Sequence, residues 1–242
     1  TRISTIEIGD PFQPFIYGQT YMPLRLAAAF DIPLIMDGEN GEAEYGGDPS
    51  TENNKGFSCN DAIDYWLSGF PLDFWLDYGF TKKDLEIYYP PDIETIKNKK
   101  IERHFFSYYR DWRPHSHYYY CVEKTGFQPN PQGRSEGTYS KYASLDDLLD
   151  PLHYYFSLLK FGIARSTSDA AHEIREKVIT RDEGVALVRK FDTEFPSQKT
   201  IDIFLRYTNL KEQELSDCFD KWRNLNLWHK ISGEWKLKKQ VE

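Results

Sequence analysis

Hydrophobic positions recur with helical spacing through the second half of the chain. Asp150 with Pro151 in the first turn begins one apolar run, and Thr180 with Glu183 has the spacing of a capping box. These patterns predict a mainly helical subdomain over residues 144–242. The expected helices are Asp150–Phe161, Ser166 or Thr167 through Lys177, Thr180–Phe191, Lys199–Tyr207 and Lys211–Arg223, followed by a hairpin over Leu227–Leu237 that turns at Ser232 and Gly233.

The first part of the chain has a different pattern. Glycines and prolines punctuate residues 1–18, which predicts irregular structure there. Gln19–Phe30 is typical of a helix with a small apolar patch, and Ile32–Met36 is typical of a short buried strand. A helix followed by a buried strand indicates an α/β sheet. We therefore expect residues 1–143 to belong to a parallel-sheet domain.

The middle of the chain contains shorter elements. We expect helices at Asp61–Leu67, Thr81–Tyr88 and Asp92–Lys99, and strands at Ile101–Tyr109 and Ser116–Glu123. The second of these strands would carry Cys121, Glu123 and Lys124 toward the end of the sheet where the first strand stops. It would also place His115 and His117 on one face, where a metal site is conceivable, although ordinary surface or core histidines are the stronger alternative.

An acidic, glycine-rich loop over residues 37–48 follows the first strand. Ligands of doubly wound sheets sit at the carboxyl ends of the strands, and Mg²⁺ prefers carboxylates together with phosphate oxygens. Asp37 or Glu39 is therefore a candidate Mg²⁺ ligand. The alternative is an exposed acidic turn.

Residues 118–175 mix cations, glycines and aromatic side chains. Four cations, Lys124, Arg134, Lys160 and Arg165, lie in this stretch. Arginine matches phosphate or carboxylate with its planar fork, and lysine adds a point charge, so the stretch suits an anionic ligand that has an apolar part. The alternative is that these cations are solvated and the glycines only end helices.

Composition narrows the classes of function. The formal net charge of −8 over 242 residues argues against nonspecific nucleic-acid binding. No apolar run approaches the roughly 20 residues of a membrane span. Three widely spaced cysteines without a Cys-x-x-Cys pair predict neither a self-contained zinc site nor a disulfide framework, and they favour the reducing cytoplasm.

Several long motifs resemble one family. They are Cys-Val-Glu-Lys-Thr-Gly-Phe (121–127), Gly-Arg-Ser-Glu-Gly-Thr (133–138), Lys-Phe-Gly-Ile-Ala-Arg (160–165) followed by Asp-Ala (169–170), the acidic loop from Gly38 to Gly47, and Ile-Thr-Arg-Asp-Glu-Gly (179–184). Together they resemble the C-terminal half of the N-acetyl sugar amidotransferases. These are PP-loop ATPases that make acetamidino sugars for bacterial surface glycans such as lipopolysaccharide.

The resemblance implies a fold and a reaction. The fold would be the C-terminal part of an α/β PP-loop domain, an adenine nucleotide α-hydrolase-like parallel sheet, followed by the helical subdomain. The reaction would use ATP and Mg²⁺ to activate the acetamido oxygen of a nucleotide sugar. Ammonia from a separate glutaminase would then form the amidine.

The resemblance also implies roles for particular residues. Catalytic residues would be Glu39, Lys124 and Arg165. Nucleotide or sugar contacts would come from Asn40, Glu44, Tyr45, Gly46, Gly47, Glu123, Gly126, Arg134, Lys160 and Asp169, of which Asp169 would orient Arg165. Cys121 would join upstream cysteines in a zinc site, or else serve as a small buried apolar side chain.

The chain departs from the family in one respect. The serine-glycine-glycine-lysine-aspartate-serine nucleotide signature is absent from its residues, so we expect a fragment that does not turn over ATP alone. Two further interpretations stay open. One is a non-catalytic sugar-binding half, and the other is a winged-helix-like interaction module formed by the last helices and the hairpin.

Overall fold

The computed structural model describes residues 1–38, 50, 53–56 and 69–242. Contacts divide the chain into two compact units. One unit combines Thr1–Pro11 with Arg113–Glu242, and the other is Phe12–Trp112. The predicted boundary between residues 143 and 144 stays a prediction, as does the predicted PP-loop sheet.

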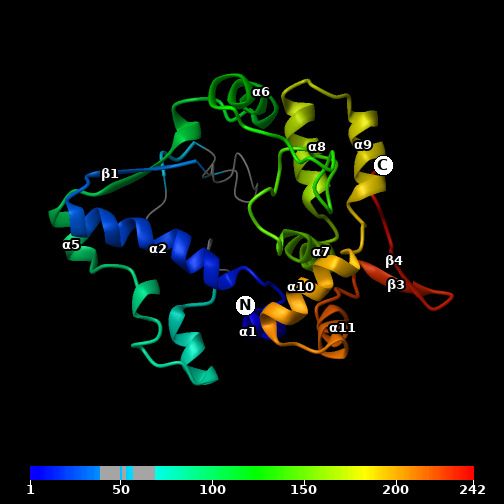
Figure 1. Ribbon diagram of the computed structural model, residues 1–242, viewed down its shortest axis with the longest axis horizontal. Helices are drawn as coiled ribbons and strands as arrows, with labels where there is room; N and C mark the ends of the chain where they lie inside the picture. Colours follow the sequence, from blue (N-terminus) through cyan, green and yellow to red (C-terminus); the bar gives the residue numbers. More distant parts are fainter. Residues whose placement is uncertain (39–49, 51–52, 57–68) are drawn as a thin grey trace. The chain divides into compact units, whose positions relative to one another are not determined.

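The unit Phe12–Trp112 is built around a small parallel sheet and a long helix. Strand β1 (Leu34–Asp37) pairs in parallel with β2 (Glu102–Phe105), with Met36 opposite His104 (Figure 1). Helix α2 (Gln13–Phe30) packs against β1. The predicted strand and the helix before it are present, although the helix begins earlier, at Gln13. The predicted burial of the strand is wrong, because Ile32, Leu34 and Met36 are exposed.

A buried ion pair ties the sheet of this unit to α2. The Arg103 side chain donates from Nε and Nη2 to the Asp37 carboxylate, at 2.6 and 2.8 Å, and also donates to the carbonyl oxygen of Thr20. Both side chains are buried, and pairing offsets the cost of removing their charges from water. Both carboxylate oxygens of Asp37, a candidate Mg²⁺ ligand, thus already accept hydrogen bonds from an arginine.

Aromatic residues fill the rest of this unit. Tyr17 on α2 packs edge-on against Trp75 with ring centroids 6.1 Å apart, and its hydroxyl donates to the carbonyl oxygen of Phe70. Short elements complete the unit: the 3₁₀ segments η2 (Leu72–Tyr78), η3 (Glu86–Tyr88) and η4 (Phe106–Tyr108), and helix α5 (Ile93–Asn98). The helix predicted over Asp92–Lys99 is present as α5, and Asp92 caps it.

The other unit is mainly helical. Its helices are α1 (Arg2–Glu7), α6 (Pro114–Thr125), α7 (Asp150–Phe161), α8 (Arg165–Arg175), α9 (Arg181–Phe191), α10 (Gln198–Thr208) and α11 (Glu212–Lys221), and the hairpin joins β3 (Trp228–Ile231) to β4 (Glu234–Leu237). Helices α8 and α9 lie side by side (Figure 1). The helical character beyond Ser144, the Thr180 capping box and the hairpin turn are confirmed.

The core of this unit forms where α7 meets α10, α11 and the hairpin. Leu152, Phe156 and Leu159 of α7 and Phe204 of α10 have no exposed surface. They pack in one cluster with residues of α11 and with Trp228, whose indole N–H donates to the carbonyl oxygen of Leu159. Helix α7 is therefore the central element of the unit.

Several local predictions are wrong. Residues 116–123 form part of helix α6 and not a strand, because Pro114 suits a first helical turn and Gly126 ends the helix in the left-handed conformation. His115 and His117 therefore do not share a strand face. Residues 1–18 contain α1 and the start of α2, where Pro14 again suits the first turn.

Two other elements differ in detail. Residues 81–88 form turns and a 3₁₀ segment and not a helix. Helix α8 begins at Arg165, before the predicted caps Ser166 and Thr167, because a carboxylate from another segment serves its first turn. The predicted helix at 61–67 lies outside the described residues.

The core makes a clear prediction for stability. We expect Phe204→Ala to lower the free energy of unfolding by about 3–5 kcal/mol, because it leaves a cavity beside α7. Tyr207→Ala on the same helix is the control; its side chain is 67% exposed and should cost no more than about 0.5 kcal/mol. Urea unfolding followed by tryptophan fluorescence measures both, and equal costs would contradict this assignment of the core.

Candidate functional site

The 133–138 segment, one of the motifs picked out in the sequence, lies between α6 and α7. Its Arg134 side chain makes a bidentate pair with Glu194, which follows α9, at 2.8 and 2.6 Å. The same guanidinium donates to the carbonyl oxygen of Thr138 and lies 4.8 Å from the centre of the Phe191 ring. Arg134 therefore anchors this loop to the end of α9.

Glu194 serves the loop in two ways. Besides pairing with Arg134, its carboxylate accepts a hydrogen bond from the backbone N–H of Gly137 at 2.8 Å. The hydrogen bond from Arg134 is the main cause that lowers the pKa of Glu194 below its ordinary value. The carboxylate is thus held in its charged form, which keeps the loop in place.

A second set of contacts joins the loop to α8. The Thr138 hydroxyl, fully buried, donates to Asp169, and Asp169 accepts from Nε of Arg165 at 2.9 Å. The Ser166 hydroxyl donates to the carbonyl oxygen of Gly137. Asp169 therefore lies against Arg165 as the sequence predicts, and Arg134 and Arg165 belong to one network that passes through Thr138.

The first turn of α8 receives its cap from Asp192. This buried carboxylate accepts from the backbone N–H groups of Ala164 and Thr167, at 2.8 and 3.0 Å, and from the Thr167 hydroxyl at 2.7 Å. Burial raises the pKa of Asp192, while the hydrogen bonds from Thr167 and Ala164 oppose that rise. The cap fixes the backbone on which Arg165 begins the helix.

Another carboxylate on α8 is surrounded by phenols. Glu173 accepts hydrogen bonds from the hydroxyls of Tyr139 and Tyr142, at 3.0 and 3.1 Å. Burial, and then the charge of Glu173, raise the pKa of both tyrosines, so both stay protonated donors. Tyr142 also stacks on Tyr118 of α6, with ring centroids 4.8 Å apart. These contacts join α6 and α8 through the segment 139–142.

His172 on α8 is a titratable side chain whose pKa lies well below its ordinary value. Its Nδ1 accepts from Arg175 at 2.6 Å, so the neutral ring carries its proton on Nε2, which lies 3.4 Å from the Ser168 hydroxyl. Burial, and then the charges of Arg175 and Arg165, lower the pKa of His172 to about 4. The imidazole is therefore neutral near pH 7.

The predicted site residues fall into three groups. Arg134, Asp169 and Arg165 belong to the network. Lys160 lies on α7, where burial lowers the pKa of its ammonium group, and its Nζ lies 3.5 Å from the carbonyl oxygen of Ile8. The remaining described candidates are at the end of α6: Glu123 and Lys124 form an exposed pair at 2.5 Å, and Gly126 ends the helix.

Other candidates lie outside the described residues. These are Glu39, Asn40, Glu44, Tyr45, Gly46 and Gly47. Their assignment to Mg²⁺, ribose or sugar hydroxyls stays a prediction.

No group of metal ligands is found among the described residues, taken as three or more His, Cys, Asp or Glu side chains placed to hold an ion. Cys121 has a free, half-buried thiol on α6, and its zinc role stays a prediction. His104 hydrogen-bonds to Glu102 at 2.6 Å and to the Tyr109 hydroxyl at 2.9 Å. In the described part of the chain, no helix is both long and apolar enough to span a membrane.

Sequence reasoning missed the carboxylates that organise the site. Asp192 and Glu194 lie in a short segment between two helices and belong to none of the motifs. A signal was present, because each motif arginine needs a partner once it is partly buried. Spacing alone does not say which of the 38 acidic residues supplies that partner.

The Arg134–Glu194 pair predicts a pH-dependent stability. We expect Glu194→Gln to lower the free energy of unfolding at pH 7 by about 1–3 kcal/mol, because the charged acceptor of several hydrogen bonds is lost. Since the folded pKa of Glu194 is lowered, its contribution is present above pH 4.5 and is lost as pH falls through the folded pKa.

Urea unfolding of the wild type and of Glu194→Gln between pH 7 and pH 3 measures this difference. It should shrink at the acid end of the range. Glu212→Gln, a charge removed from an exposed position, is the control. A difference that stays constant down to pH 3 would contradict the assigned pair.

The lowered pKa of His172 predicts a second pH dependence of the stability, at higher pH than that of Glu194. Its folded pKa lies below the ordinary 6.5, so the unfolded chain takes up the proton first and stability falls as pH drops from 6.5 toward 4. We expect His172→Gln to flatten this slope, and the exposed His229→Gln to leave it unchanged. Urea midpoints at pH 7 and pH 5 test the difference, and equal slopes in all three proteins would exclude this role.

Comparison with known proteins identifies one relationship. Residues 136–242 match the family model described as the C-terminal domain of WbpG-like LPS biosynthesis proteins. No curated protein matches the chain. The matched region starts inside the loop that Arg134 and Glu194 hold, and it contains α7 to α11 and the hairpin. Residues 136–242 are thus similar to the C-terminal domain of WbpG-like proteins of lipopolysaccharide biosynthesis.

Proposed function

We propose that the protein is an ATP-dependent amidotransferase of lipopolysaccharide or related surface-glycan biosynthesis. It would convert the N-acetyl group of a nucleotide-activated sugar to an acetamidino group. The family match supports the biosynthetic theme. The motif resemblance supports the reaction, and the three widely spaced cysteines favour a location in the cytoplasm.

One observation carries this proposal. Two of the motifs that resemble the amidotransferases, at 133–138 and 160–165, are separate in sequence and yet join in one hydrogen-bonded network. Thr138 of the first motif and Arg165 of the second meet on the same Asp169 carboxylate. Motifs that serve only as separate helix ends have no reason to converge on one carboxylate.

The proposed chemistry needs an activated leaving group. The acetamido oxygen attacks the α-phosphorus of ATP, pyrophosphate leaves, and ammonia then adds to the acetamido carbon and displaces AMP. ATP with Mg²⁺ supplies the activation, and a partner glutaminase supplies the ammonia. Negative charge develops on phosphate oxygens, and fixed cations stabilise such charge well because they need no rearrangement.

Arg165 is the described residue best suited to that role. Its guanidinium is partly exposed and is held by Asp169 from the same helix, so its orientation is set before a ligand arrives. Arg134 differs, because Glu194 takes two of its donors and Thr138 and Ser135 accept others. We therefore assign Arg134 to positioning of the loop. Lys124 would act from the exposed end of α6.

The parallel strand pair also supports a larger sheet. Leu34 and Met36 alternate along β1 and are each 44% exposed. Parallel strands are ordinarily covered on both faces. Leu34 and Met36 share one face of β1, and an apolar face left uncovered in this way fits a strand pair that belongs to a larger PP-loop domain.

A second candidate function rests on the end of the chain. Helices α9, α10 and α11 followed by the β3–β4 hairpin have the element order of a winged helix. Helix α11 is acidic, with Glu212, Glu214, Asp217 and Asp220 against a single Lys221. An acidic helix suits contact with another protein and does not suit nucleic acid. A non-catalytic sugar-binding role is the third interpretation.

The enzymatic proposal predicts a selective loss. We expect Arg165→Ala to lower the rate of amidine formation about a hundredfold or more, with only a small fall in melting temperature. The assay uses the protein from its complete gene, ATP, Mg²⁺, ammonium chloride and N-acetylated nucleotide sugars, with ATP–pyrophosphate exchange as a second readout. Arg206→Ala, on the outer surface of α10, is the matched control.

The two readouts separate the candidate functions. If Arg165→Ala abolishes both ATP–pyrophosphate exchange and amidine formation, the result supports the amidotransferase proposal. A normal rate of amidine formation in this variant would mean that Arg165 has no catalytic role. A melting temperature that falls together with the rate would mean that Arg165 has a structural role. Absence of exchange in the complete wild-type protein leaves the interaction module and the sugar-binding half as the alternatives.

A further inference from the structure

Residues 1–11 belong to the helical unit, although residues 12–112 separate them in sequence from its other part, Arg113–Glu242. We call this segment the strap. Ser4 and Thr5 of the strap have no exposed surface, and its helix α1 lies beside α11 (Figure 1). After the strap, the chain passes at Phe12 into the other unit. Nothing in the proposed reaction uses this segment.

The first end of the strap is fixed to α11 and to the residue that follows it. Arg2 donates to the Glu214 carboxylate at 3.0 Å. The carbonyl oxygen of Ile6 accepts from the indole N–H of Trp222 at 3.1 Å and from the Lys221 ammonium group at 2.7 Å. Arginine, lysine and glutamate side chains ordinarily keep their charges between about pH 6 and pH 8. These contacts therefore hold the first end throughout the neutral range.

Gly9 lets the strap turn against the same tryptophan. Its φ is +67°, and a Cβ atom there would lie 2.5 Å from ring atoms of Trp222. A side chain at this position would therefore be strained and would collide with the indole. The turn leads from the fixed residues to α7, where Asp10 lies beside a histidine.

Two basic side chains of α7 hold the second end of the strap. Nδ1 of His153 lies 3.0 Å from Oδ1 of Asp10, whose side chain is 14% exposed. Nζ of Lys160 lies 3.5 Å from the carbonyl oxygen of Ile8. A carboxylate that leaves water needs a donor, and His153 supplies one. Residues 8–10 therefore depend on side chains of a different kind from those that hold residues 1–7.

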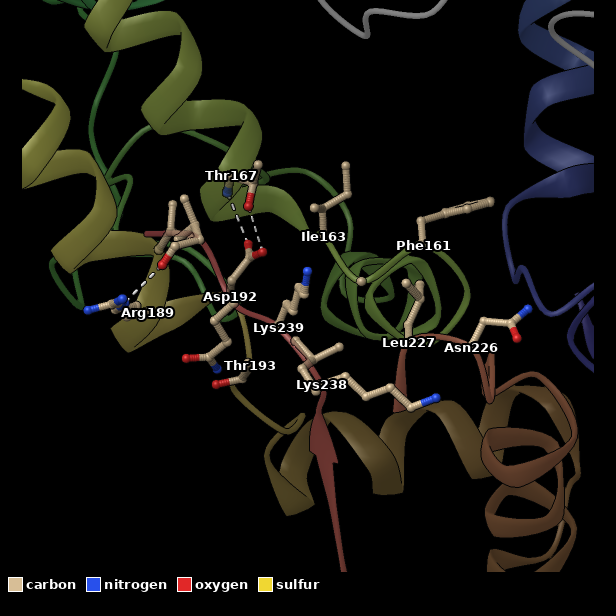
Figure 2. A pocket seen from close by; sticks show the side chains of 15 residues that line it. Phe161, Ile163, Thr167, Arg189, Asp192, Thr193, Asn226, Leu227, Lys238 and Lys239 are labelled. Atoms are coloured by element: carbon tan, nitrogen blue, oxygen red, sulfur yellow. Dashed lines mark hydrogen bonds between the residues drawn. The ribbon is translucent and has the colours of Figure 1, made fainter. Parts of the chain in front are cut away.

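Lys160 belongs to the 160–165 motif, but its surroundings differ from those of the residues that follow it. Phe161, Gly162 and Ile163 line a pocket of about 460 Å³, which is also lined by the C-terminal segment 238–241 (Figure 2). Lys160 is not among the residues that line this pocket. Burial lowers the pKa of its ammonium group, and the charge of Asp10 opposes that change. This motif lysine therefore serves the strap.

His153 is the side chain of this contact that titrates near neutral pH. Burial acts to lower its pKa, but the charge of Asp10, the hydrogen bond to Asp10 and the charge of Asp150 together raise the pKa above the ordinary 6.5. The charge of Lys160 opposes this rise. Because the folded pKa is raised, the stabilisation from the ion pair is complete below pH 6.5 and is lost as pH rises through the folded pKa.

We propose that the strap is a pH-sensitive hinge at the point where the chain leaves the helical unit. Protonated His153 holds Asp10 and closes the hinge. Loss of the proton frees residues 8–10, while α11 keeps residues 1–7 in place. Gly9 is the pivot, because glycine enters and leaves the left-handed region at little steric cost. The proposal does not depend on amidotransferase activity.

Amide hydrogen exchange in the 242-residue chain tests the hinge. The backbone N–H groups of Ile8 and Asp10 both donate to the carbonyl oxygen of Ser4, so their exchange reports the release of this end. Rates at pH 6 and pH 8.5 are divided by the intrinsic rate at each pH, which leaves the change in protection. We expect protection at these two amides to fall about three- to tenfold at the higher pH, because a charge-assisted hydrogen bond becomes a neutral one.

Two variants remove the titrating pair in different ways. His153→Gln keeps a hydrogen-bonding side chain without a titratable group, and Asp10→Asn removes the charge with little change in shape. Both variants should show low protection at Ile8 and Asp10 at both pH values. His229→Gln, on the exposed hairpin, is the matched control and should keep the wild-type pH dependence.

The amino group of Thr1 is a second group on the strap that titrates near this range, because burial lowers its pKa from 8.0. His153→Gln leaves this amino group in place. A pH dependence that the amino group causes would therefore survive in that variant, and a dependence that His153 causes would not.

Three results would overturn the proposal. The first is protection at Ile8 and Asp10 that is the same at both pH values in the wild type. The second is a pH dependence that persists in His153→Gln. The third is an equal loss of protection at Phe204 in the core, which would mean that the whole unit opens and that no local hinge exists.

Discussion

Two carboxylates in the short segment after α9 hold the described part of the site together. Glu194 pairs with Arg134 and receives the Gly137 N–H, while Asp192 caps the first turn of α8. Backbone donors and guanidinium groups that leave water need acceptors, and these two side chains supply them. The loop at 133–138 and the start of α8 therefore depend on a segment that has no motif of its own.

The contacts of the loop and of α8 give Arg134 and Arg165 different surroundings. Arg134 is enclosed by acceptors from its own chain, and an incoming phosphate would have to compete with the Glu194 carboxylate. Arg165 is held at Nε by Asp169, which sets the direction of its side chain. A charge that is fixed before a ligand arrives stabilises that ligand without a cost of reorganisation. Arg134 thus holds the loop in place, and under the proposed function Arg165 would be the arginine that contacts the ligand.

Buried charge also organises the unit Phe12–Trp112. Arg103 of β2 reaches across to Asp37 of β1 and to backbone carbonyls of α2, so one side chain connects both strands with the helix. The pair is nearly inaccessible to water, and removing either partner alone would leave an uncompensated charge. The carboxyl end of β1 is therefore fixed, although the loop that follows it lies outside the described residues.

Local patterns in the sequence are sufficient for much of the helical unit. Pro151 in a first turn, the Thr180–Glu183 capping box and the Ser232–Gly233 turn are each determined by residues close together in the chain. The helices and the hairpin that they predict are present. The aromatic run at 116–123 was misinterpreted because tyrosine favours strands on average, while the flanking Pro114 and Gly126 favour a helix. Local signals for a strand and for a helix compete in that element, and the strand prediction was wrong.

The partners of the motif residues could not be obtained from the sequence. Thr138 meets Asp169, Arg134 meets Glu194, and Phe161 faces a pocket closed by the C-terminal segment. Each of these contacts joins residues more than 25 positions apart, and many acidic side chains were equally available by charge. Sequence by itself determined most helices of this unit and the motif residues for which roles are proposed, because those features are local. Only the tertiary structure decided which carboxylate neutralises which arginine, because that choice depends on how the helices pack.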